Sequence, residues 1–262
     1  MAEPRAAIID LDGTVYREDQ MILNADRGIN ILRTAGLETL FLTNSALDSP
    51  RSIQQKLSDF GIQVDTEHIL TSGVITAKYL AEHYPDSTSL IIGEETIGKV
   101  FEEVGIAQTN DPAIADVLVS SLDRQIDYHK FTKALRTLDE ETLFVATNPD
   151  RTRPGRDGLL PSTRAITGAI EAMCQRQPDL VLGKPAKSTC EIALNQLGLS
   201  AEEVYMIGDR LDTDIVMGNA VGMTTILVTT GVTTEEMLNE ASVQPDHIIN
   251  SLSQLSELNI SR

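Results

Sequence analysis

Short apolar runs of strand length alternate along this chain with stretches that have the apolar spacing of helices. Ala6–Ile9 is the first run, a helical pattern with Ile29 and Leu32 on one face follows it, and the next run is 39–42. Strands that alternate with helices pair in parallel, because each helix returns the chain to the starting edge of the sheet. The sequence therefore predicts an α/β fold with a parallel sheet.

The alternation restarts near residue 88, which indicates a second α/β unit. Its strand-like runs are 90–93, 117–120 and 143–146, and a segment rich in turn formers and charges follows at 148–161. Strand-like runs then return at 180–182, 204–207 and 225–228. We therefore predict a discontinuous domain, residues 1–74 plus 181–262, with a second α/β domain inserted at 75–180.

Charge excludes some classes of function. The 262 residues include 39 acidic and 21 basic side chains, for a formal net charge of −18. Binding to nucleic acid or to an anionic membrane is disfavoured, because both need basic surfaces. No apolar run approaches the roughly 20 residues of a membrane span. Only Cys174 and Cys190 are present, and the N-terminus lacks an apolar signal core, so we expect a cytoplasmic protein.

Polar residues suited to phosphate chemistry follow several predicted strands, where ligands bind in open parallel sheets. Asp10 and Asp12 end the first run, Thr43-Asn44 the second, and Gly208-Asp209 to Asp214 the run at 204–207. Two carboxylates at i and i+2 can hold Mg²⁺ while one attacks phosphorus. The carboxylates after residue 208 would repel one another without a cation. Lys184 is placed between Gly183 and Pro185 after the run at 180–182.

Each of these segments alone also has an ordinary structural interpretation. The first could be an Asx turn, Thr43-Asn44-Ser45 a common turn, Lys184 a solvated side chain and Asp212 a helix cap.

The segment 93–100 nearly matches a P-loop, but its last residue is Val and two Glu would face the phosphates. We interpret it as a strand-to-helix turn of the inserted domain.

Together the motifs resemble the haloacid dehalogenase superfamily of phosphatases, in their order, spacing and strand-end context. The residues that carry the resemblance are Asp10-Leu11-Asp12-Gly13-Thr14, Thr43-Asn44, Gly183-Lys184-Pro185 and Gly208-Asp209 to Asp214. Ala146–Asp150 and Thr224–Val228 extend it, so that it covers essentially the whole chain and looks like the NagD-like, p-nitrophenyl-phosphatase branch. This resemblance implies a Rossmann-like, doubly wound parallel core and a large C2-type α/β cap that sets substrate specificity.

The resemblance also implies catalytic roles. Asp10 would be the nucleophile that forms an aspartyl-phosphate, and Asp12 would protonate the leaving alcohol and then activate water. Thr43 and Lys184 would hold the phosphoryl oxygens, with Asn44 as a neighbouring donor. A carboxylate at position 12 favours phosphoryl transfer, because relatives that dehalogenate lack it.

For the metal, the resemblance implies Mg²⁺ bound by Asp10 and Asp209. Asp12 would contribute its backbone carbonyl, and Asp214 would act through water or by orienting Lys184. The expected function is hydrolysis of small phosphomonoesters. A phosphotransferase or phosphomutase of the same superfamily, or a phospho-acceptor module without enzymatic activity, is the alternative.

The resemblance also implies that the segment after the run at 143–146 sets substrate specificity. It begins with Asn148 and Asp150. Three arginines follow within six positions, although the chain as a whole is strongly acidic: Arg151, Arg153 and Arg156. Arg side chains suit a carboxylate or a second phosphate, although pairing with local acids would also explain them. The expected partner is a small phosphorylated metabolite, with neither nucleic acid nor membrane, and a homodimer is left open.

Overall fold

The computed structural model describes residues 3–153, 155 and 157–258. The contacts of the chain divide it into two compact units, and we treat each separately. Unit 1 takes in the described residues of Met1–Thr43, Pro50–Leu70 and Lys184–Arg262, and unit 2 those of Asn44–Ser49 and Thr71–Gly183. Their borders at 70/71 and 183/184 lie a few residues from the predicted domain borders at 74/75 and 180/181. The segment Asn44–Ser49 groups with unit 2.

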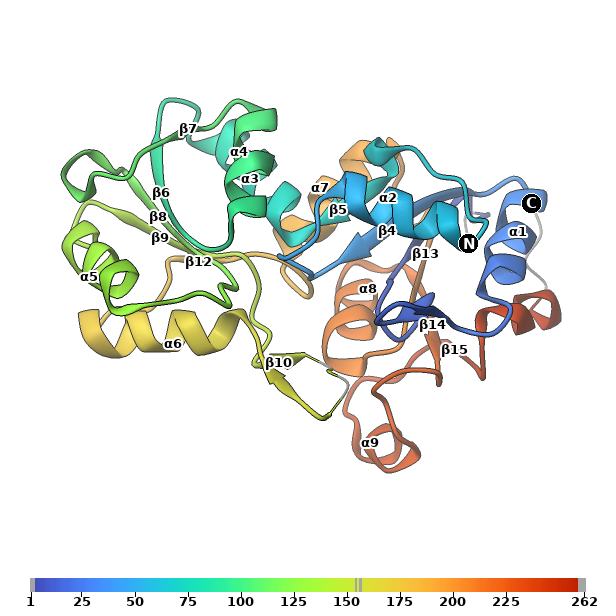
Figure 1. The fold of residues 1–262 in the computed structure, drawn as a ribbon. Coiled ribbons are helices and arrows are strands. Elements are labelled where there is room, and N and C mark those ends of the chain that lie inside the picture. Colours follow the sequence, from blue (N-terminus) through green and yellow to red (C-terminus); the bar gives the residue numbers. More distant parts are fainter. Residues whose placement is uncertain (1–2, 154, 156, 259–262) are drawn as a thin grey trace. The chain divides into compact units, whose positions relative to one another are not determined.

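Unit 1 is built on a six-stranded sheet with the strand order β15-β14-β13-β1-β4-β5 (Figure 1). Its strands are β1 (Ala6–Ile9), β4 (Glu38–Thr43), β5 (Ile69–Thr71), β13 (Val204–Gly208), β14 (Thr224–Val228) and β15 (His247–Ile249). β1 pairs in parallel with β4 on one side and with β13 on the other. The order therefore reverses at β1, which makes its carboxyl end the expected ligand site.

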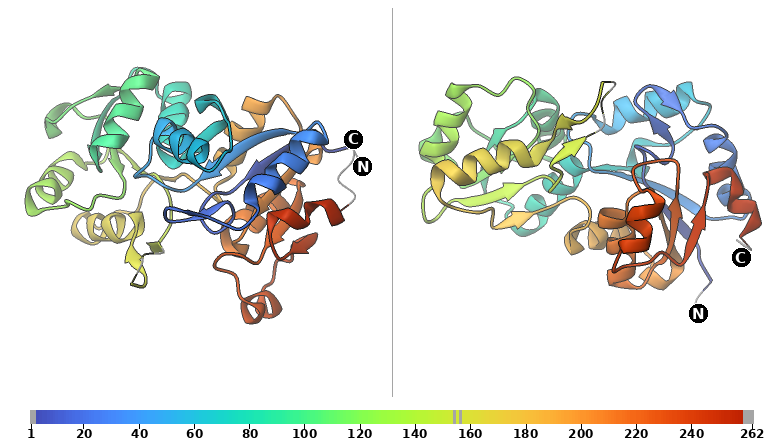
Figure 2. Two further views of the ribbon diagram at one scale, coloured as in Figure 1. Left: turned by 45° about the vertical axis from the view of Figure 1, so that its right-hand side comes forward. Right: turned by 90° about the horizontal axis from the view of Figure 1, so that it is seen from below.

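Helices cover both faces of this sheet (Figure 2). They are α1 (Ala25–Thr34), α2 (Pro50–Asp59), α7 (Lys187–Leu197), α8 (Val216–Val221) and α9 (Glu235–Glu240). Ala7 and Ile9 of β1 share a buried core with α1 and α2, whereas α7 contacts β4 and α8 contacts β14. The remaining elements are a hairpin of β2 (Tyr16–Arg17) and β3 (Gln20–Met21), 3-10 helices at Thr66–His68, Ala201–Glu203 and Leu252–Glu257, and a π-helix at Leu211–Ile215.

Unit 2 contains a five-stranded sheet with the order β12-β9-β8-β6-β7, and all four neighbouring pairs are parallel. Its strands are β6 (Thr88–Ile92), β7 (Ala107–Gln108), β8 (Val117–Ser120), β9 (Leu143–Ala146) and β12 (Leu180–Val181). The helices α5 (Tyr128–Thr137) and α6 (Thr163–Cys174) share a core with the strands β6, β8 and β9. The helices α3 (Ser72–His83) and α4 (Glu95–Val104) pack against each other, and a 3-10 helix spans Pro112–Ile114.

The segment 93–100 is the predicted strand-to-helix turn, since β6 ends at Ile92 and α4 begins at Glu95. One local interpretation needs correction. Segment 148–161 is not only a loop, because it forms an antiparallel pair of β10 (Thr152–Arg153) and β11 (Leu160–Pro161). Asn24 precedes α1 with a left-handed backbone of φ 61°, and its side chain makes no capping hydrogen bond.

No helix in the described part of the chain is long and apolar enough to cross a membrane.

Candidate active site

The two acidic motifs of unit 1 leave neighbouring strands at the same edge of the sheet. Ile9 of β1 lies opposite Ile207 of β13, and the Asp10 N–H donates to the Ile207 carbonyl at 2.9 Å. Asp10 follows β1 directly, and Asp209 follows β13 directly. The pairing register therefore brings together two carboxylates that are almost two hundred residues apart in sequence.

Lys184 joins this group as its cation. The Lys184 ammonium donates to Asp10 Oδ1 and, at 2.7 Å, to Asp214 Oδ1. The three side chains are almost completely buried, with Lys184 2% exposed. Burial of a long charged side chain is unfavourable unless it is paired, and here the ammonium is paired twice.

Asp214 reaches the cluster from the π-helix that follows β13. Its Oδ2 accepts from the Arg210 N–H at 3.1 Å, and its own N–H donates to the Arg210 carbonyl at 3.1 Å. A Cβ at Gly208 would overlap the Asp214 carboxyl group, so glycine is required here for close approach. Asp212, the third acid of this motif, is exposed and pairs with Arg210 instead. Asp212 does lie in the first turn of the π-helix, as the helix-cap interpretation expects, but the N-cap residue is Arg210.

The electrostatics of the cluster follow from its burial. Burial raises the pKa of Asp10, although the Lys184 charge opposes this. Burial and the charges of Asp10 and Asp214 raise the pKa of Asp209 to about 8. Burial also raises the pKa of Asp214 to about 6, although the Lys184 charge opposes this. For Lys184 burial acts against the charged form, but the attraction of both carboxylates outweighs it and raises the pKa.

The cluster fits a divalent metal ion. Oxygens of Asp10, Asp209 and Asp214 lie within 4.8 Å of one another. Three carboxylates and one ammonium leave two negative charges unbalanced when all are ionised. Asp209 is fully buried, and its Oδ1 has no hydrogen-bond partner among the described residues. Carboxylate oxygens are ligands that Mg²⁺ and similar hard cations prefer, so the residues suit such an ion.

Unit 1 contains three further residues of the sequence motifs: Thr43, Thr14 and Asp12. Thr43 ends β4 two residues beyond Phe41, the partner of Ile9, and is buried. Thr14, from the same motif as Asp10, has its hydroxyl 3.5 Å from Asp10 Oδ2. Asp12 is exposed, and its side chain is not in the carboxylate group; the role expected of its backbone carbonyl stays a prediction.

Asn44 and two of the specificity residues form a polar network within unit 2. The Asn44 side-chain amide donates to Asp150 Oδ1 at 3.2 Å, and the Asn148 amide donates to the Asn44 carbonyl at 3.0 Å. Ser72 also donates to the Asn44 carbonyl at 3.0 Å. Gly183, with φ 74°, packs against the same residues, because a Cβ there would lie 2.8 Å from Asn44 Oδ1. These contacts explain why Asn44 groups with unit 2 rather than with Thr43.

Arg153 is part of β10, and Arg151 directly precedes that strand. Arg151 is exposed, and Arg153 is half-buried with no hydrogen-bond partner for its Nε in the part of the chain that is described. Arg156 lies outside the described residues. Asp150, one of the local acids that could pair with an arginine, accepts the hydrogen bond from Asn44.

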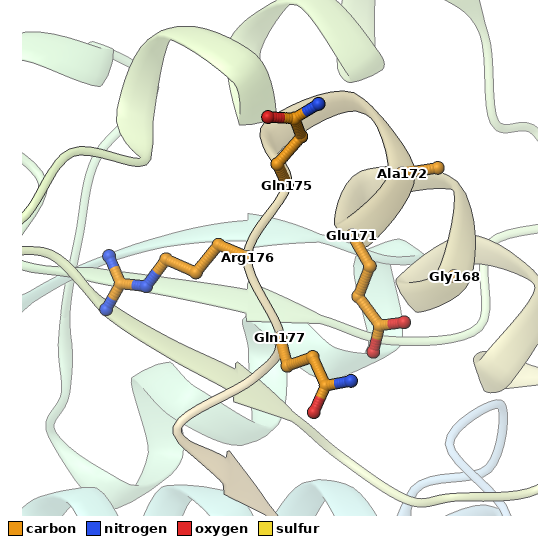
Figure 3. A pocket seen from close by; sticks show the side chains of 6 residues that line it. All are labelled: Gly168, Glu171, Ala172, Gln175, Arg176 and Gln177. Atoms are coloured by element: carbon orange, nitrogen blue, oxygen red, sulfur yellow. The ribbon is translucent and has the colours of Figure 1, made fainter.

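A separate depression of about 380 Å³ lies at the end of α6 in unit 2 (Figure 3). Its lining residues are Gly168, Glu171, Ala172, Gln175, Arg176 and Gln177. The side chains of Glu171 and Gln177 point into the same space, whereas Arg176 points away from it. None of the residues singled out in the sequence lines this depression.

The loop after β14 is a part of the site that the sequence motifs do not indicate. The Val232 N–H donates to Asp209 Oδ2 at 2.6 Å, and the Thr233 hydroxyl donates to the Asp209 carbonyl at 2.6 Å. The Thr230 hydroxyl donates to the Gly13 carbonyl at 2.6 Å. The only available signal was Gly231 among threonines directly after a predicted strand, which is also ordinary turn composition.

Comparison with known proteins agrees with this geometry. A family model described as haloacid dehalogenase-like hydrolase matches residues 7–107, and a model described as HAD-hydrolase-like matches residues 181–255. The chain is 34% identical to the sugar-phosphatase AraL of Bacillus subtilis over 255 residues, which cover 97% of this chain and 93% of that protein.

Solved structures give the same result. A p-nitrophenyl phosphatase from Archaeoglobus fulgidus matches with a TM-score of 0.92 and 35% identity, over 98% of this chain and 99% of that chain. NagD from Escherichia coli K-12 matches with a TM-score of 0.88 and 26% identity, over 97% and 98%. The chain therefore belongs to the haloacid dehalogenase-like hydrolases, as a phosphatase of the NagD-like type.

Proposed function

We propose that this phosphatase is a Mg²⁺-dependent phosphomonoesterase that works through an aspartyl-phosphate on Asp10. The observation that carries the proposal is the buried cluster of Asp10, Lys184, Asp209 and Asp214 at the carboxyl ends of β1 and β13. It supplies a nucleophilic oxygen, a fixed ammonium and a set of metal ligands in one place. Phosphoryl transfer needs these positioned charges more than it needs other covalent chemistry.

In the first step a carboxylate oxygen of Asp10 attacks phosphorus, and the bond from phosphorus to the leaving oxygen breaks. The carboxyl group of Asp12 donates its proton to that oxygen, so that a neutral alcohol leaves. The exposed side chain of Asp12, two residues beyond Asp10, is accessible to a substrate in this way. The phosphoryl group is then held as a mixed anhydride on Asp10.

In the second step Asp12, now a carboxylate, takes a proton from water, and the water oxygen attacks phosphorus. The bond between phosphorus and Asp10 breaks, inorganic phosphate leaves, and the Asp10 carboxylate is restored. Asp12 is protonated again and ready for the next substrate. The same residue therefore serves as acid in one step and as base in the other.

Lys184 and Thr43 would bind the phosphoryl oxygens, and Asn44 is a neighbouring donor whose amide also bonds to Asp150. The metal would be held by Asp10 and Asp209, with Asp214 acting through water or on Lys184. When bound, Mg²⁺ neutralises charge on the phosphoryl group and the carboxylates. Lys184 keeps the Asp10 carboxylate in a fixed orientation through its hydrogen bond.

The proposed substrates are small phosphomonoesters that carry a second polar or anionic group, with sugar phosphates as the first candidates. The relative named sugar-phosphatase supports this class. Residues 75–180 would form the specificity domain, in which Asn148 and Asp150 shape the loop and Arg151, Arg153 and Arg156 supply positive charge. The two unpaired cysteines suit a reducing cytoplasm as the location.

The test of catalysis is phosphate release from p-nitrophenyl phosphate by the full chain. We expect many turnovers with Mg²⁺, loss of activity with EDTA, and recovery when Mg²⁺ is restored. Asp10→Asn should lower kcat by roughly 10⁴-fold or more. Asp212→Asn is the matched control, because Asp212 is exposed and, within the described part of the chain, forms its ion pair with Arg210. Activity that survives in Asp10→Asn, or that ignores EDTA, would contradict the proposal.

Two further measurements separate the related possibilities. With an added acceptor alcohol, equal yields of phosphate and leaving alcohol support hydrolysis, whereas a shortfall of phosphate identifies a phosphotransferase.

For specificity, Arg151→Ala and Arg153→Ala are compared with wild type on p-nitrophenyl phosphate and on phosphoesters with a second anionic group. We expect kcat/KM to fall more on the second class. Equal losses on both classes would contradict the role of these arginines.

A further inference from the structure

We propose that the loop after β14, residues 230–233, positions Asp209 so that one of its carboxylate oxygens stays available as a metal ligand. The inference rests on the proposed function and extends it to residues outside the four motifs. The loop fixes Asp209 at two points, through the Val232 N–H to Oδ2 and through the Thr233 hydroxyl to the Asp209 carbonyl, each at 2.6 Å. The side chain and the backbone of Asp209 are therefore both restrained by the same loop.

The two oxygens of Asp209 have different surroundings. Oδ2 accepts the short hydrogen bond from the Val232 N–H. Oδ1 is buried and has no hydrogen-bond partner within the described residues. Leaving an anionic oxygen buried without a partner is costly, and a bound cation is a partner that would remove this cost. A carboxylate that binds a metal through one oxygen is typically held in place by a hydrogen bond to its other oxygen, and Asp209 has this arrangement.

Two glycines leave the space in which this carboxylate lies. A Cβ at Gly13 would lie 2.5 Å from Asp209 Oδ2, and a Cβ at Gly231 would overlap the same oxygen. Gly13 also has a positive φ of 85°, so a substitution there would change backbone strain as well as space. Gly231 is not among the residues with positive φ, so its requirement is one of space. An alanine at position 231 therefore displaces the carboxylate without demanding a left-handed backbone.

A third contact joins this loop to the nucleophile motif. The Thr230 hydroxyl donates to the Gly13 carbonyl at 2.6 Å, three residues beyond Asp10. The loop therefore holds both the Asp209 side chain and the turn that follows Asp10. Its residues act through Asp209 and Gly13, so they are positioning residues, and the effect of their replacement should appear first in metal affinity. Replacing partners of this kind typically weakens metal binding 10- to 100-fold.

The test is calorimetric titration of Mg²⁺ into EDTA-treated, dialysed full-length protein. We expect Gly231→Ala to bind Mg²⁺ at least about 10-fold more weakly than wild type. Gly168→Ala is the control for the same chemical change, because nothing lies within 4 Å of a Cβ there. It should bind Mg²⁺ as wild type does. Far-UV circular dichroism and the Tm in EDTA establish that each variant is folded.

A second pair of variants keeps the inference testable if Gly231→Ala does not fold. Thr233→Val removes the hydroxyl that holds the Asp209 carbonyl, and Thr233→Ser restores a hydroxyl. We expect the first to weaken Mg²⁺ binding and the second to approach the wild-type affinity. Thr229→Val is the control, because Thr229 is exposed and directly precedes this loop. Wild-type affinity in folded Gly231→Ala or in Thr233→Val overturns the inference alone. Absence of Mg²⁺ binding by wild-type protein overturns the proposed metal dependence, and this inference with it.

Discussion

The Lys184 ammonium is buried because two carboxylates accept its hydrogen bonds. Removing it would leave Asp10 and Asp214 facing each other without a cation in a region that excludes water. Without a bound cation the two groups would then be neutralised by protonation, and burial already raises the pKa of both. Lys184 therefore serves stability as well as the proposed chemistry.

We expect Lys184→Met to lower the free energy of unfolding by about 3–5 kcal/mol, because it breaks a buried ion pair from one side. It should also lower kcat/KM by roughly 10²-fold or more, since a charge aimed at the transferring group is lost. Urea unfolding followed by circular dichroism, in EDTA, measures the first effect. Lys187→Met is the control, because Lys187 is exposed and its pair with Glu191 contributes little. Equal stability of the two variants would contradict this account of Lys184.

Cys190 gives a pH dependence whose sign follows from burial. Burial raises the pKa of its thiol to about 11 from 9.0, with a smaller contribution from the Glu191 charge. The unfolded chain therefore loses this proton at lower pH than the folded chain. Stability is fully retained below about pH 9 and falls as the pH rises towards about 11. We expect urea unfolding of Cys190→Ser to lack this part of the decline; an identical pH dependence in both proteins would refute it.

The sequence could locate the acidic residues but not their orientation. Asp10 and Asp209 follow apolar runs, so their place at the carboxyl edge of a parallel sheet is predictable. Asp209 Oδ2 accepts from Val232, whereas Oδ1 has no partner among residues 3–153, 155 and 157–258, and this difference depends on a loop distant along the chain. Contacts of this kind carry no local pattern, which explains why residues 230–233 were missed.

At the scale of elements, close packing rather than local preference decides where glycine is needed. Gly28 lies inside α1, which contacts the 3-10 helix Leu252–Glu257. A Cβ at Gly28 would lie 2.5 Å from the Leu252 carbonyl oxygen. Gly168 lies inside α6, beside the depression in Figure 3, with open space where its Cβ would be. The two helical glycines therefore have opposite surroundings.

This difference predicts opposite effects of the same substitution. Gly28→Ala should lower the free energy of unfolding by about 1–3 kcal/mol, because overpacking outweighs the gain in helix propensity. Gly168→Ala should raise it by about 0.5–1 kcal/mol, because only the propensity gain remains. Urea unfolding of both variants under identical conditions measures the two changes. A stabilised Gly28→Ala would mean that α1 does not pack as described.

Elements with a strong apolar pattern were predictable, and those held by distant contacts were not. The runs at 6–9, 117–120 and 143–146 coincide with β1, β8 and β9. The β10–β11 hairpin was not predicted, because Arg, Pro and Gly in segment 148–161 give no alternation of apolar and polar residues. Its two-residue strands instead depend on pairing across the turn, which a local pattern does not record.

At the scale of the molecule, the net charge of −18 contrasts with the need to attract an anionic substrate. In the proposed function, four of the 39 acidic residues, Asp10, Asp12, Asp209 and Asp214, act on the metal and the phosphoryl group. The remaining acids repel phosphate esters at long range. Local attraction must then come from Lys184, the metal and, in the proposed specificity loop, the arginines. The sequence predicts this separation of the acidic residues into site residues and the remainder. The hydrogen bond between Asn44 and Asp150, in contrast, could be found only from the contacts within unit 2.

The central claim is that the phosphoryl group is transferred to Asp10. The most direct measurement is an acid quench of the enzyme during turnover of p-nitrophenyl phosphate, followed by borohydride reduction of any acyl phosphate and peptide mass spectrometry. The account predicts reduction at Asp10, absent without substrate. Reduction at Asp12 or Asp209, or an unmodified protein while phosphate is released in a burst, would contradict it.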